Sequence, residues 1–221
     1  MDQVTAAEWK QLIERVFEPR SDLGETSIAL MMDLPDDVVE DTPAWKTLRN
    51  LVASWAATMQ AADDMPVSVH LYVYRNAHTN NGDLPETARA WDKPAAPDHI
   101  GECMDRPAVT FADLFSRHRI WIAPTHFSAT APLKVAARNT GIRGATMPGF
   151  TAAMIPALRL DYGVINARVQ LLKGLVDRAT RATFRFAVEG GDTHDLVLDL
   201  RHRTGHASGG ILRTPGVAGN L

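Results

Sequence analysis

Ile120-Trp-Ile-Ala-Pro124, with the polar loop Thr125-His-Phe-Ser-Ala-Thr130 directly behind it, is the stretch that decides the fold. The apolar run is too short for a helix and ends at a proline, which predicts a buried strand. Residues 131–138 then predict a helix, because Pro132 suits its first turn.

This helix has candidate caps at both ends. Ser128 or Thr130 can serve as its N-cap, and Asn139 to Gly141 ends it. Ile142 to Met147 predicts the next strand, so the whole stretch forms one βαβ unit. Such a unit places a polar loop at the carboxyl end of a buried strand, beside a helix N-terminus, where open α/β sheets usually bind ligands.

Composition narrows the class of protein. The chain has 221 residues, of which 45% are hydrophobic and 22% are charged, as in an ordinary globular protein with a real core. A net charge of -3 gives no reason to expect nucleic acid or an anionic membrane as partner. Cys103 is the only cysteine, which excludes an internal disulfide and a CxxC site. Because the N-terminus lacks a signal-peptide pattern and no apolar run approaches the roughly 20 residues of a membrane span, we expect a cytoplasmic protein.

Hydrophobic spacing predicts the remaining elements. Helices are expected over residues 5–17, 43–62, 110–117, 151–159 and 161–180, and strands over 26–34 and 67–74. Residues 75–101 and the glycine-rich tail 205–221 show no regular pattern and predict irregular structure. Five apolar side chains of the helix over 161–180 are expected to face inward: Val164, Ile165, Val169, Leu172 and Val176.

Together these elements predict the α/β fold class in three layers, with a mainly parallel sheet and helices on both faces. Residues 1–160 are expected to form this Rossmann-like domain. Residues 161–221 are expected to form a C-terminal helix and β-hairpin extension that serves dimerisation or peptide binding.

The hairpin is predicted by residues 182–188 and 195–200, which alternate with period two around Glu189-Gly-Gly-Asp192. A lone hairpin is marginal in water unless it packs on another surface. Its apolar side and free edge are therefore expected to meet a missing domain, a second copy of the chain, or an added peptide strand. The residues expected at this peptide-strand or dimer edge are Phe184, Phe186, Val188, Leu196, Val197 and Leu198.

Motifs for the common chemistries are missing. The sequence contains no GxSxG elbow and neither a GxGxxG nor a GxxxxGK(S/T) phosphate loop, so acyl transfer of the usual type and nucleotide binding lack support. His202 and His206 have ligand-like spacing, with Asp199 nearby. A solvated turn is favoured over a zinc site, because the segment leaves a strand into a glycine-rich turn, whereas a zinc site would prefer the pair on a helix or beside a cysteine pair and needs a third ligand. Asp36 to Asp41 is favoured as a solvated acidic turn, with a cap or ligand contact as the alternative. No catalytic residue, metal or cofactor is therefore expected.

Candidate ligand-binding residues lie instead in the crevice at the strand ends. For His126 a simple loop histidine is favoured over a ligand contact, and for Ser128 and Thr130 helix capping is favoured over catalysis. Capping does not exclude holding an anion, so a peptide carboxylate at this helix N-terminus is expected. The candidate residues are Asn80, Asn81, Thr125, His126, Ser128 and Thr130.

Several short motifs resemble one known family when they are taken in order along nearly the whole chain. They are Leu34-Pro-Asp-Asp37, Asp41-Thr-Pro-Ala-Trp45, Asn80-Asn-Gly-Asp-Leu-Pro-Glu86, Phe127-Ser-Ala-Thr-Ala-Pro-Leu133, Ala145-Thr-Met-Pro-Gly149, Asp199-Leu-Arg-His-Arg-Thr-Gly205 and Gly216-Val-Ala-Gly-Asn-Leu221. This succession is similar to the N-terminal portion of aminopeptidase T-type metallopeptidases, the leucyl-aminopeptidase-like family. The resemblance implies an α/β N-terminal domain and commonly a homodimer.

The same resemblance implies that the family's metal ligands lie in a second domain, the first of them just beyond Leu221. Two functions are therefore expected. The favoured one is a non-catalytic peptide-binding accessory protein that presents a precursor peptide in the maturation of a ribosomally synthesised natural product; this pathway is an analogy. The alternative is the N-terminal domain of a metal-dependent aminopeptidase whose catalytic domain is absent.

Overall fold

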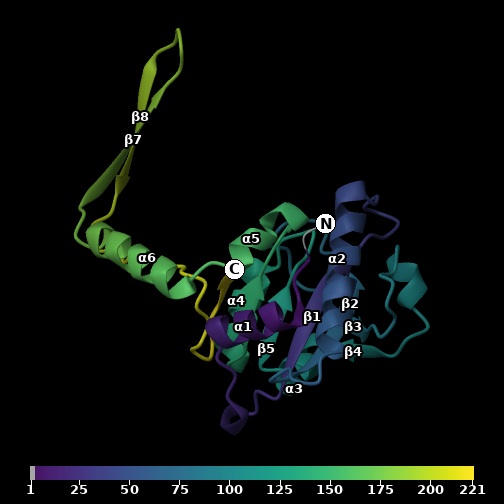
Figure 1. The fold of residues 1–221 in the computed structure, drawn as a ribbon. Coiled ribbons are helices and arrows are strands. Elements are labelled where there is room, and N and C mark those ends of the chain that lie inside the picture. The colour runs from purple at the N-terminus through teal and green to yellow at the C-terminus, as the bar shows by residue number, and fades with distance from the viewer. Residues whose placement is uncertain (1–2) are drawn as a thin grey trace. The chain divides into compact units, whose positions relative to one another are not determined.

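The computed structural model describes residues 3–221 (Figure 1). The chain forms two compact units: residues up to Leu160 together with Gly210–Leu221 make the first, and Asp161–Gly209 makes the second. The division predicted from the sequence placed all of residues 161–221 in one extension. Residues 210–221 belong instead with the α/β unit, because a strand near their end pairs with its sheet.

A seven-stranded sheet forms the middle layer of the first unit, in the order β4-β3-β2-β1-β5-β6-β9. Strands β2, β1, β5, β6 and β9 run parallel, whereas β3 and β4 add to one edge in antiparallel pairs. The strands are β1 (Ser27–Leu34), β2 (Ser68–Arg75), β3 (Thr87–Ala90), β4 (Ala108–Thr110), β5 (Ile120–Ala123), β6 (Arg143–Thr146) and β9 (Ala218–Asn220). The predicted α/β class with a mainly parallel sheet is confirmed.

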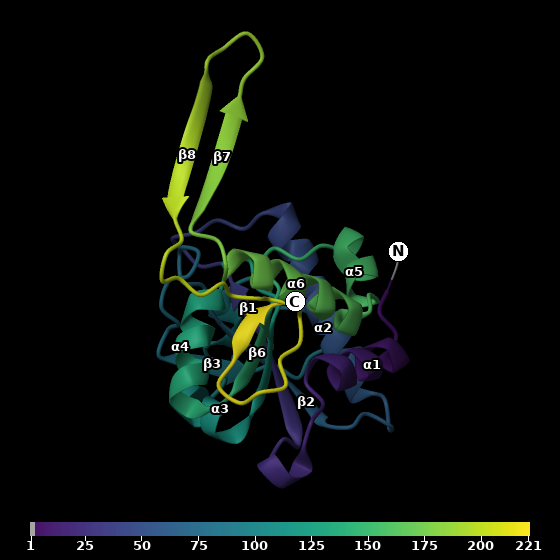
Figure 2. The ribbon, with the colours of Figure 1, turned by 90° about the vertical axis from the view of Figure 1, so that its left-hand side faces the viewer.

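Helices cover both faces of this sheet (Figure 2). The α-helices of the first unit are α1 (Ala6–Val16), α2 (Pro43–Gln60), α3 (Phe111–Arg117), α4 (Thr130–Thr140) and α5 (Ile155–Leu158), and its short 3-10 helices are η1 (Ser21–Leu23), η2 (Ile100–Cys103) and η3 (Ala152–Met154). Helices α3 and α4 lie on one side of the sheet, and α1 and α2 lie on the other. No helix within residues 3–221 is both long enough and apolar enough to cross a membrane.

Side chains alternate between the two faces of each strand and pack against the helices on both sides of the sheet. On the side of α3 and α4, Met31 and Trp121 of neighbouring strands pack in one buried cluster with Phe111 and Leu133. On the other side Trp9 of α1 meets Trp55 of α2 edge-on, with ring centroids 5.0 Å apart. Strand β1 is buried along its whole length, as its continuous apolar run predicts for a strand covered on both faces.

Helices α1, α2 and α3 each begin at a threonine that caps the helix. Thr5 forms a full capping box with Glu8 before α1, and Thr42 accepts a hydrogen bond from the backbone N–H of Trp45 before α2. Thr110 accepts from the N–H of Asp113 at 3.1 Å before α3. Each cap satisfies an N–H that has no partner inside its helix.

Two short strands lie in segments that were expected to be irregular, and a third was not predicted at all. Strand β3 falls within residues 75–101 and β9 falls in the glycine-rich tail, while β4 lies just before α3. Strand β9 can approach β6 because Gly144 has no side chain; a Cβ added there would lie 3.3 Å from the Cβ of Ala218. These strands are three or four residues long, so their partners rather than their own patterns decide their structure.

Arg143 holds the tail segment against the rest of the first unit. Its guanidinium is buried and lies 2.5 Å from the carboxylate of the equally buried Glu25. The same side chain donates to the carbonyl oxygens of Phe17, of Leu212 at 3.1 Å and of Arg213 at 3.0 Å. A single charged side chain therefore connects β6 to three segments that are distant in sequence.

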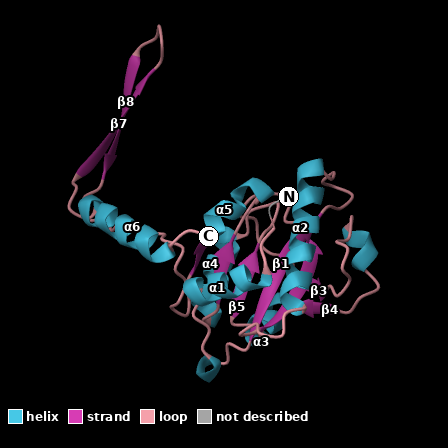
Figure 3. Cartoon of the chain, in the orientation of Figure 1, coloured by secondary structure: helices cyan, strands magenta, loops and turns pink. Residues whose placement is uncertain are grey.

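The second unit consists of helix α6 (Tyr162–Val176) and the hairpin of β7 (Arg181–Ala187) and β8 (Thr193–Asp199) (Figure 3). Asp161 caps α6 by accepting from the N–H groups of Gly163 and Val164. The hairpin is confirmed, with a register that pairs Phe184 with Leu196.

The predicted inward face of α6 is wrong. Val164, Leu172 and Val176 are exposed by 46%, 61% and 43%. Ile165 and Val169 are only half-buried. The apolar spacing correctly predicts a helix, but spacing alone does not reveal whether another layer lies against it.

Candidate functional site

The crevice at the carboxyl ends of the parallel strands brings together four of its six predicted residues. Asn80 and Asn81 follow β2, Ser128 lies between β5 and α4, and Thr130 is the first residue of α4. Asn80 Oδ1 accepts the backbone N–H of Ser128 at 2.8 Å, and the N–H of Asn81 donates to the Ser128 carbonyl at 2.7 Å. The two loops are thus joined by reciprocal hydrogen bonds across neighbouring parts of the sheet edge.

The N-terminus of α4 has its donors already engaged by these side chains. Asn81 Oδ1 accepts from the N–H of Ala131 at 3.0 Å, and Ser128 Oγ accepts from the N–H of Thr130 at 3.3 Å. Pro132 has no N–H, and the N–H of Leu133 donates to Ala129 inside the helix. A carboxylate at this position would therefore have to displace Asn81 or Ser128.

The N-cap position of α4 is Ala129, which makes no side-chain cap. Neither predicted residue, Ser128 or Thr130, occupies it. Thr130 is the first residue of the helix, and its hydroxyl lies 2.9 Å from that of Thr146 and donates to Asn220 Oδ1 at 3.0 Å. Asn220 belongs to β9, a strand that no sequence pattern predicted, so its approach to this crevice could not be foreseen.

Thr125 and His126 are engaged elsewhere. Thr125 is fully buried, and its hydroxyl donates to the carbonyl of Phe127 at 2.6 Å. The His126 ring stacks on Trp45 with centroids 4.2 Å apart and planes 13° apart. Burial is the main cause that lowers the pKa of His126. His126 thus packs on α2.

Asp33 is a buried carboxyl group that the sequence analysis missed, because it lies inside the apolar run of β1. Its two oxygens accept the backbone N–H groups of His126 at 2.7 Å and Phe127 at 2.8 Å. Burial raises its pKa to about 6, against these hydrogen bonds, which act to lower it. Asp33 therefore fixes the start of the β5–α4 loop.

Asp36 corrects the prediction of a solvated acidic turn. It is 7% exposed and accepts the N–H groups of Val38 and Val39 and a hydrogen bond from His78 Nε2 at 2.8 Å. Burial raises its pKa, but the bonds from His78 and the two amides outweigh it and lower the pKa to about 2. Asp36 is thus an ionised group that caps its own turn, which was the alternative left open.

Within residues 3–221, no three His, Cys, Asp or Glu side chains lie close enough to hold a metal ion together. His202 and His206, the pair with ligand-like spacing, are both exposed. No protein-family model, curated protein or solved structure matches this chain. The likeness to aminopeptidase T-type enzymes therefore stays a prediction.

The hairpin carries a second candidate site, which its register divides into two faces. Three cross-strand pairs point to one face: Ala182 with Leu198, Phe184 with Leu196 and Phe186 with His194. The opposite face holds the pairs Arg181 with Asp199, Thr183 with Val197 and Arg185 with Asp195. We call the first set the apolar face and the second the polar face.

Val197 therefore differs from the other predicted edge residues. It lies on the polar face across from Thr183, whereas Phe184, Phe186, Leu196 and Leu198 lie on the apolar face. A one-residue step along a strand reverses the direction of a side chain, and apolar character alone did not reveal that reversal. Val188 lies just beyond β7 and is 67% exposed.

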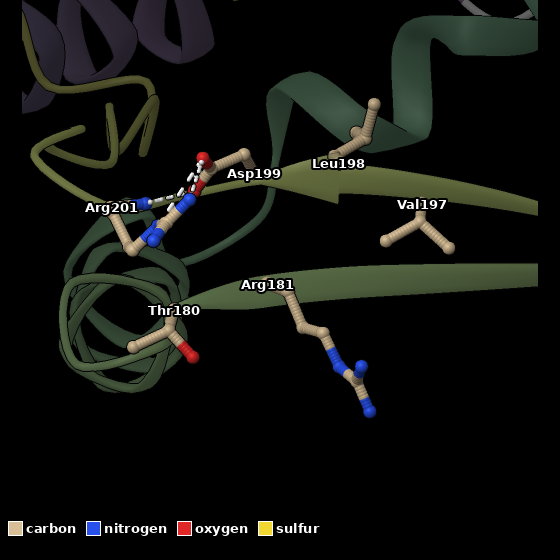
Figure 4. Close-up of a pocket in the computed structure, with 6 residues that line it drawn as sticks. All are labelled: Thr180, Arg181, Val197, Leu198, Asp199 and Arg201. Atoms are coloured by element: carbon tan, nitrogen blue, oxygen red, sulfur yellow. Dashed lines mark hydrogen bonds and ion pairs between the residues drawn. The ribbon is translucent and has the colours of Figure 1, made fainter.

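A pocket of about 360 Å³ lies at the base of the hairpin. It is lined by Thr180 and Arg181 from the start of β7, by Val197 to Asp199 from the end of β8, and by Arg201 (Figure 4). Arg201 holds the Asp199 carboxylate through its guanidinium at 2.8 Å and through its backbone N–H at 3.0 Å. The Arg181 side chain points away from this pair.

Proposed function

We propose that this protein is a non-catalytic peptide-binding accessory protein and that an extended peptide adds as a third strand to the β7–β8 hairpin. The two-stranded sheet supports this most directly, since each of its strands has a neighbour on one side only. An unpaired strand edge presents a row of N–H and C=O groups that can pair with an added chain. The proposal keeps the expected cytoplasmic location and a precursor peptide as ligand.

The hairpin register identifies which backbone groups point outward. The N–H of Leu200 donates to the carbonyl of Thr180 at 3.0 Å, and these residues continue the register of the ladder. Hydrogen-bonded and non-hydrogen-bonded pairs alternate in an antiparallel ladder. The pair Thr183–Val197 is therefore non-hydrogen-bonded, and its backbone N–H and C=O groups face the two free edges.

The crevice at the sheet edge is a weaker candidate for holding the peptide. Its best anion position, the N-terminus of α4, has its N–H groups bonded to Asn81 and Ser128. A peptide carboxylate would replace two existing hydrogen bonds before gaining any. At the hairpin edge a peptide would not replace hydrogen bonds within the protein, because the outward N–H and C=O groups of the strands would exchange hydrogen bonds with water only.

Proline substitution on each edge tests strand addition. Val197→Pro removes an outward N–H of β8 and Thr183→Pro removes one of β7, and neither removes a bond inside the hairpin. The probe is a set of fluorescein-labelled ten-residue peptides with alternating β-branched and polar residues, titrated by fluorescence anisotropy. We expect saturable binding to the unmodified protein and at least tenfold weaker binding to one of the two proline variants.

Val197→Ala and Thr183→Ala are the matched controls, because they shorten the same side chains and keep the N–H groups. They are expected to bind like the unmodified protein. Strand addition would be contradicted if no peptide shows saturable binding. It would also be contradicted if both proline variants bind the peptides as tightly as the unmodified protein does.

The second candidate function, the N-terminal domain of a metal-dependent aminopeptidase, is favoured by the apolar side chains that α6 and the hairpin expose. A further domain of a longer polypeptide would cover such side chains. Sequencing the source gene beyond the codon for Leu221 tests this: an open frame that encodes further glutamates and histidines supports it, and a stop codon rejects it.

A further inference from the structure

We propose that one stripe of helix α6 is a docking surface for an acidic amphipathic helix of a separate polypeptide. Five residues form this stripe, because their i, i+4, i+7, i+8 and i+11 spacing places them on one side of the helix: Val164, Arg168, Leu171, Leu172 and Leu175. Four of them are apolar, with exposed fractions between 46% and 74%. We call these residues the α6 stripe. The inference concerns a different surface from the proposed strand addition and does not rest on it.

The chain that returns from the hairpin covers the other side of α6. Asp177, just after the helix, accepts the backbone N–H of Gly205 at 2.7 Å, and a Cβ added at Gly209 would lie 2.9 Å from Asn166 Cα. The returning chain therefore passes along the side that carries Asn166 and Lys173, which are both half-buried. A surface helix normally buries its apolar side and exposes its polar side. In α6 this arrangement is reversed, so the returning chain does not cover the α6 stripe.

The spacing of the α6 stripe suits a second helix as its occupant. Val164, Arg168 and Leu172 follow one another at i, i+4 intervals and form one ridge, and Leu171 and Leu175 form a second ridge beside it. The groove between two such ridges receives the side-chain ridge of another helix. The stripe extends over about three helical turns, so a partner helix of similar length would contact all of it.

Arg168 determines the charge of the partner. It is exposed and is the single charged residue of the α6 stripe. The positions three and four residues away from it hold only aliphatic side chains: Val164, Ile165, Leu171 and Leu172. Helix α6 therefore offers no carboxylate at the spacing that pairs with an arginine. A charged group that a partner covers needs a counter-charge, so the partner helix carries Asp or Glu opposite Arg168 and apolar residues on both sides of it.

The same charge argues against two other occupants. A second copy of α6 would bring a second Arg168 to the contact and no carboxylate, so that two like charges would share one small apolar surface. The apolar face of the hairpin also carries no acidic side chain, so it would leave Arg168 covered without a counter-charge. An acidic amphipathic helix of a separate polypeptide matches both the leucines and the arginine of the α6 stripe.

Charge reversal tests this docking surface directly. The probe is a fluorescein-labelled fifteen-residue peptide, stapled into a helix on its polar side, with leucines at i, i+4, i+7 and i+11 and one glutamate among them. A second peptide has lysine in place of this glutamate. In anisotropy titrations the unmodified full chain is expected to bind the glutamate peptide saturably and roughly tenfold more tightly than the lysine peptide. Arg168→Glu is expected to reverse this preference.

Two neighbouring positions of α6 provide a matched pair of variants. Leu171 and Gln170 are both exposed, but only Leu171 belongs to the α6 stripe. Leu171→Glu is expected to weaken binding of the glutamate peptide roughly tenfold or more, whereas Gln170→Glu is expected to leave it unchanged. Circular dichroism spectra equal to that of the unmodified protein show that the variants fold. If Leu171→Glu does not fold, the reversal of preference in Arg168→Glu decides the question.

Helix docking and strand addition are tested independently, because Val197→Pro is expected to leave the affinity for the glutamate peptide unchanged. The proposal is overturned if neither peptide binds saturably, if both bind the unmodified protein with equal affinity, or if Gln170→Glu weakens binding as much as Leu171→Glu. Binding to vesicles of anionic phospholipid without binding to either peptide would overturn it in favour of a membrane surface. Self-association that is lost in Leu171→Glu would overturn it in favour of a second copy.

Discussion

Asp33 at the end of β1 accepts the backbone N–H of His126 at 2.7 Å, and this bond positions the loop between β5 and α4. The neighbouring N–H of Phe127 donates to the second oxygen of the same carboxyl group at 2.8 Å. Trp45 closes the arrangement from α2, because its indole N–H donates to the Asp33 carbonyl at 3.1 Å while its ring stacks on His126. One buried acid thus connects three elements at the carboxyl ends of the parallel strands.

Replacing Asp33 by Asn is expected to lower the free energy of unfolding by about 1–3 kcal/mol at pH 7, because an amide offers one acceptor where two N–H groups need one each. Urea denaturation measures this change. Asp37→Asn is the control, since the Asp37 side chain is fully exposed and its removal is expected to change little. Equal stability of Asp33→Asn and the unmodified protein would contradict the account of this loop.

The pKa of Asp33 predicts the pH dependence of stability. Burial raises this pKa to about 6 from an ordinary value of 3.8. Between those two values the folded protein binds a proton that the unfolded chain has released, so the stability contributed by this group falls as pH rises from about 4 to 6. Denaturation curves at several pH values, compared with those of Asp33→Asn, measure the difference. A midpoint near 4 for Asp33 in an NMR titration would refute the shift.

Asp36 is expected to act in the opposite direction. Its pKa is lowered to about 2, so its contribution to stability is present above about 4 and is lost as pH falls toward 2. His78→Ala removes the bond at 2.8 Å, and we expect the pKa of Asp36 to rise toward its ordinary value. Carboxyl-carbon NMR titration reads this pKa directly. His99→Ala, which removes another histidine near the same turn, should leave it unchanged.

The buried pair of Arg143 and Glu25 predicts a strong single-mutant effect and a smaller double-mutant one. Arg143→Met removes the positive charge beside the buried Glu25 carboxylate, which keeps only the hydrogen bond from the backbone N–H of Arg20. Glu25→Gln removes the negative charge beside the buried Arg143 guanidinium. Removing one partner of a buried pair costs about 3–5 kcal/mol. The double variant is expected to lose clearly less than the sum of the two. Additive losses in urea denaturation would show that the pair is not coupled.

Asn81 combines a strained backbone with a capping side chain. Its φ is +61°, in the left-handed region, and its Oδ1 accepts from Ala131 N–H and Ser128 Oγ. Asn81→Ala loses both bonds and keeps the strain, so about 1–2 kcal/mol of unfolding free energy should be lost. Asn81→Gly loses the same bonds but relieves the strain, and should therefore unfold at a higher temperature than Asn81→Ala. Differential scanning calorimetry measures both unfolding temperatures. A higher unfolding temperature for Asn81→Ala than for Asn81→Gly would show that the left-handed backbone at this position costs no free energy.

Much of the fold could be predicted from local signals. The unbroken apolar run of β1, the capping residues Thr5, Thr42 and Thr110, and the alternation in the hairpin each determine an element through neighbours in sequence. The βαβ unit around β5 and α4 also placed Asn80, Asn81, Ser128 and Thr130 near one sheet edge, because parallel strands present their carboxyl ends together.

Other features depend on residues that are far apart in the chain. Strand β9 exists only because Ala218 lies against Gly144, and Asn220 reaches the crevice for the same reason. The role of Asp33 depends on two amides in the loop after β5. Spacing could not tell that much of α6 is exposed.

The sequence by itself determined the α/β class, the start of each long helix and the hairpin, since hydrophobic period and caps act over a few residues. Only the tertiary structure decided which polar groups are buried together, which short strands pair and whether a neighbouring layer covers the apolar side of α6. The physical reason is that burial, pKa and strand pairing are properties of distant groups brought into contact, and a local pattern carries no information about that contact.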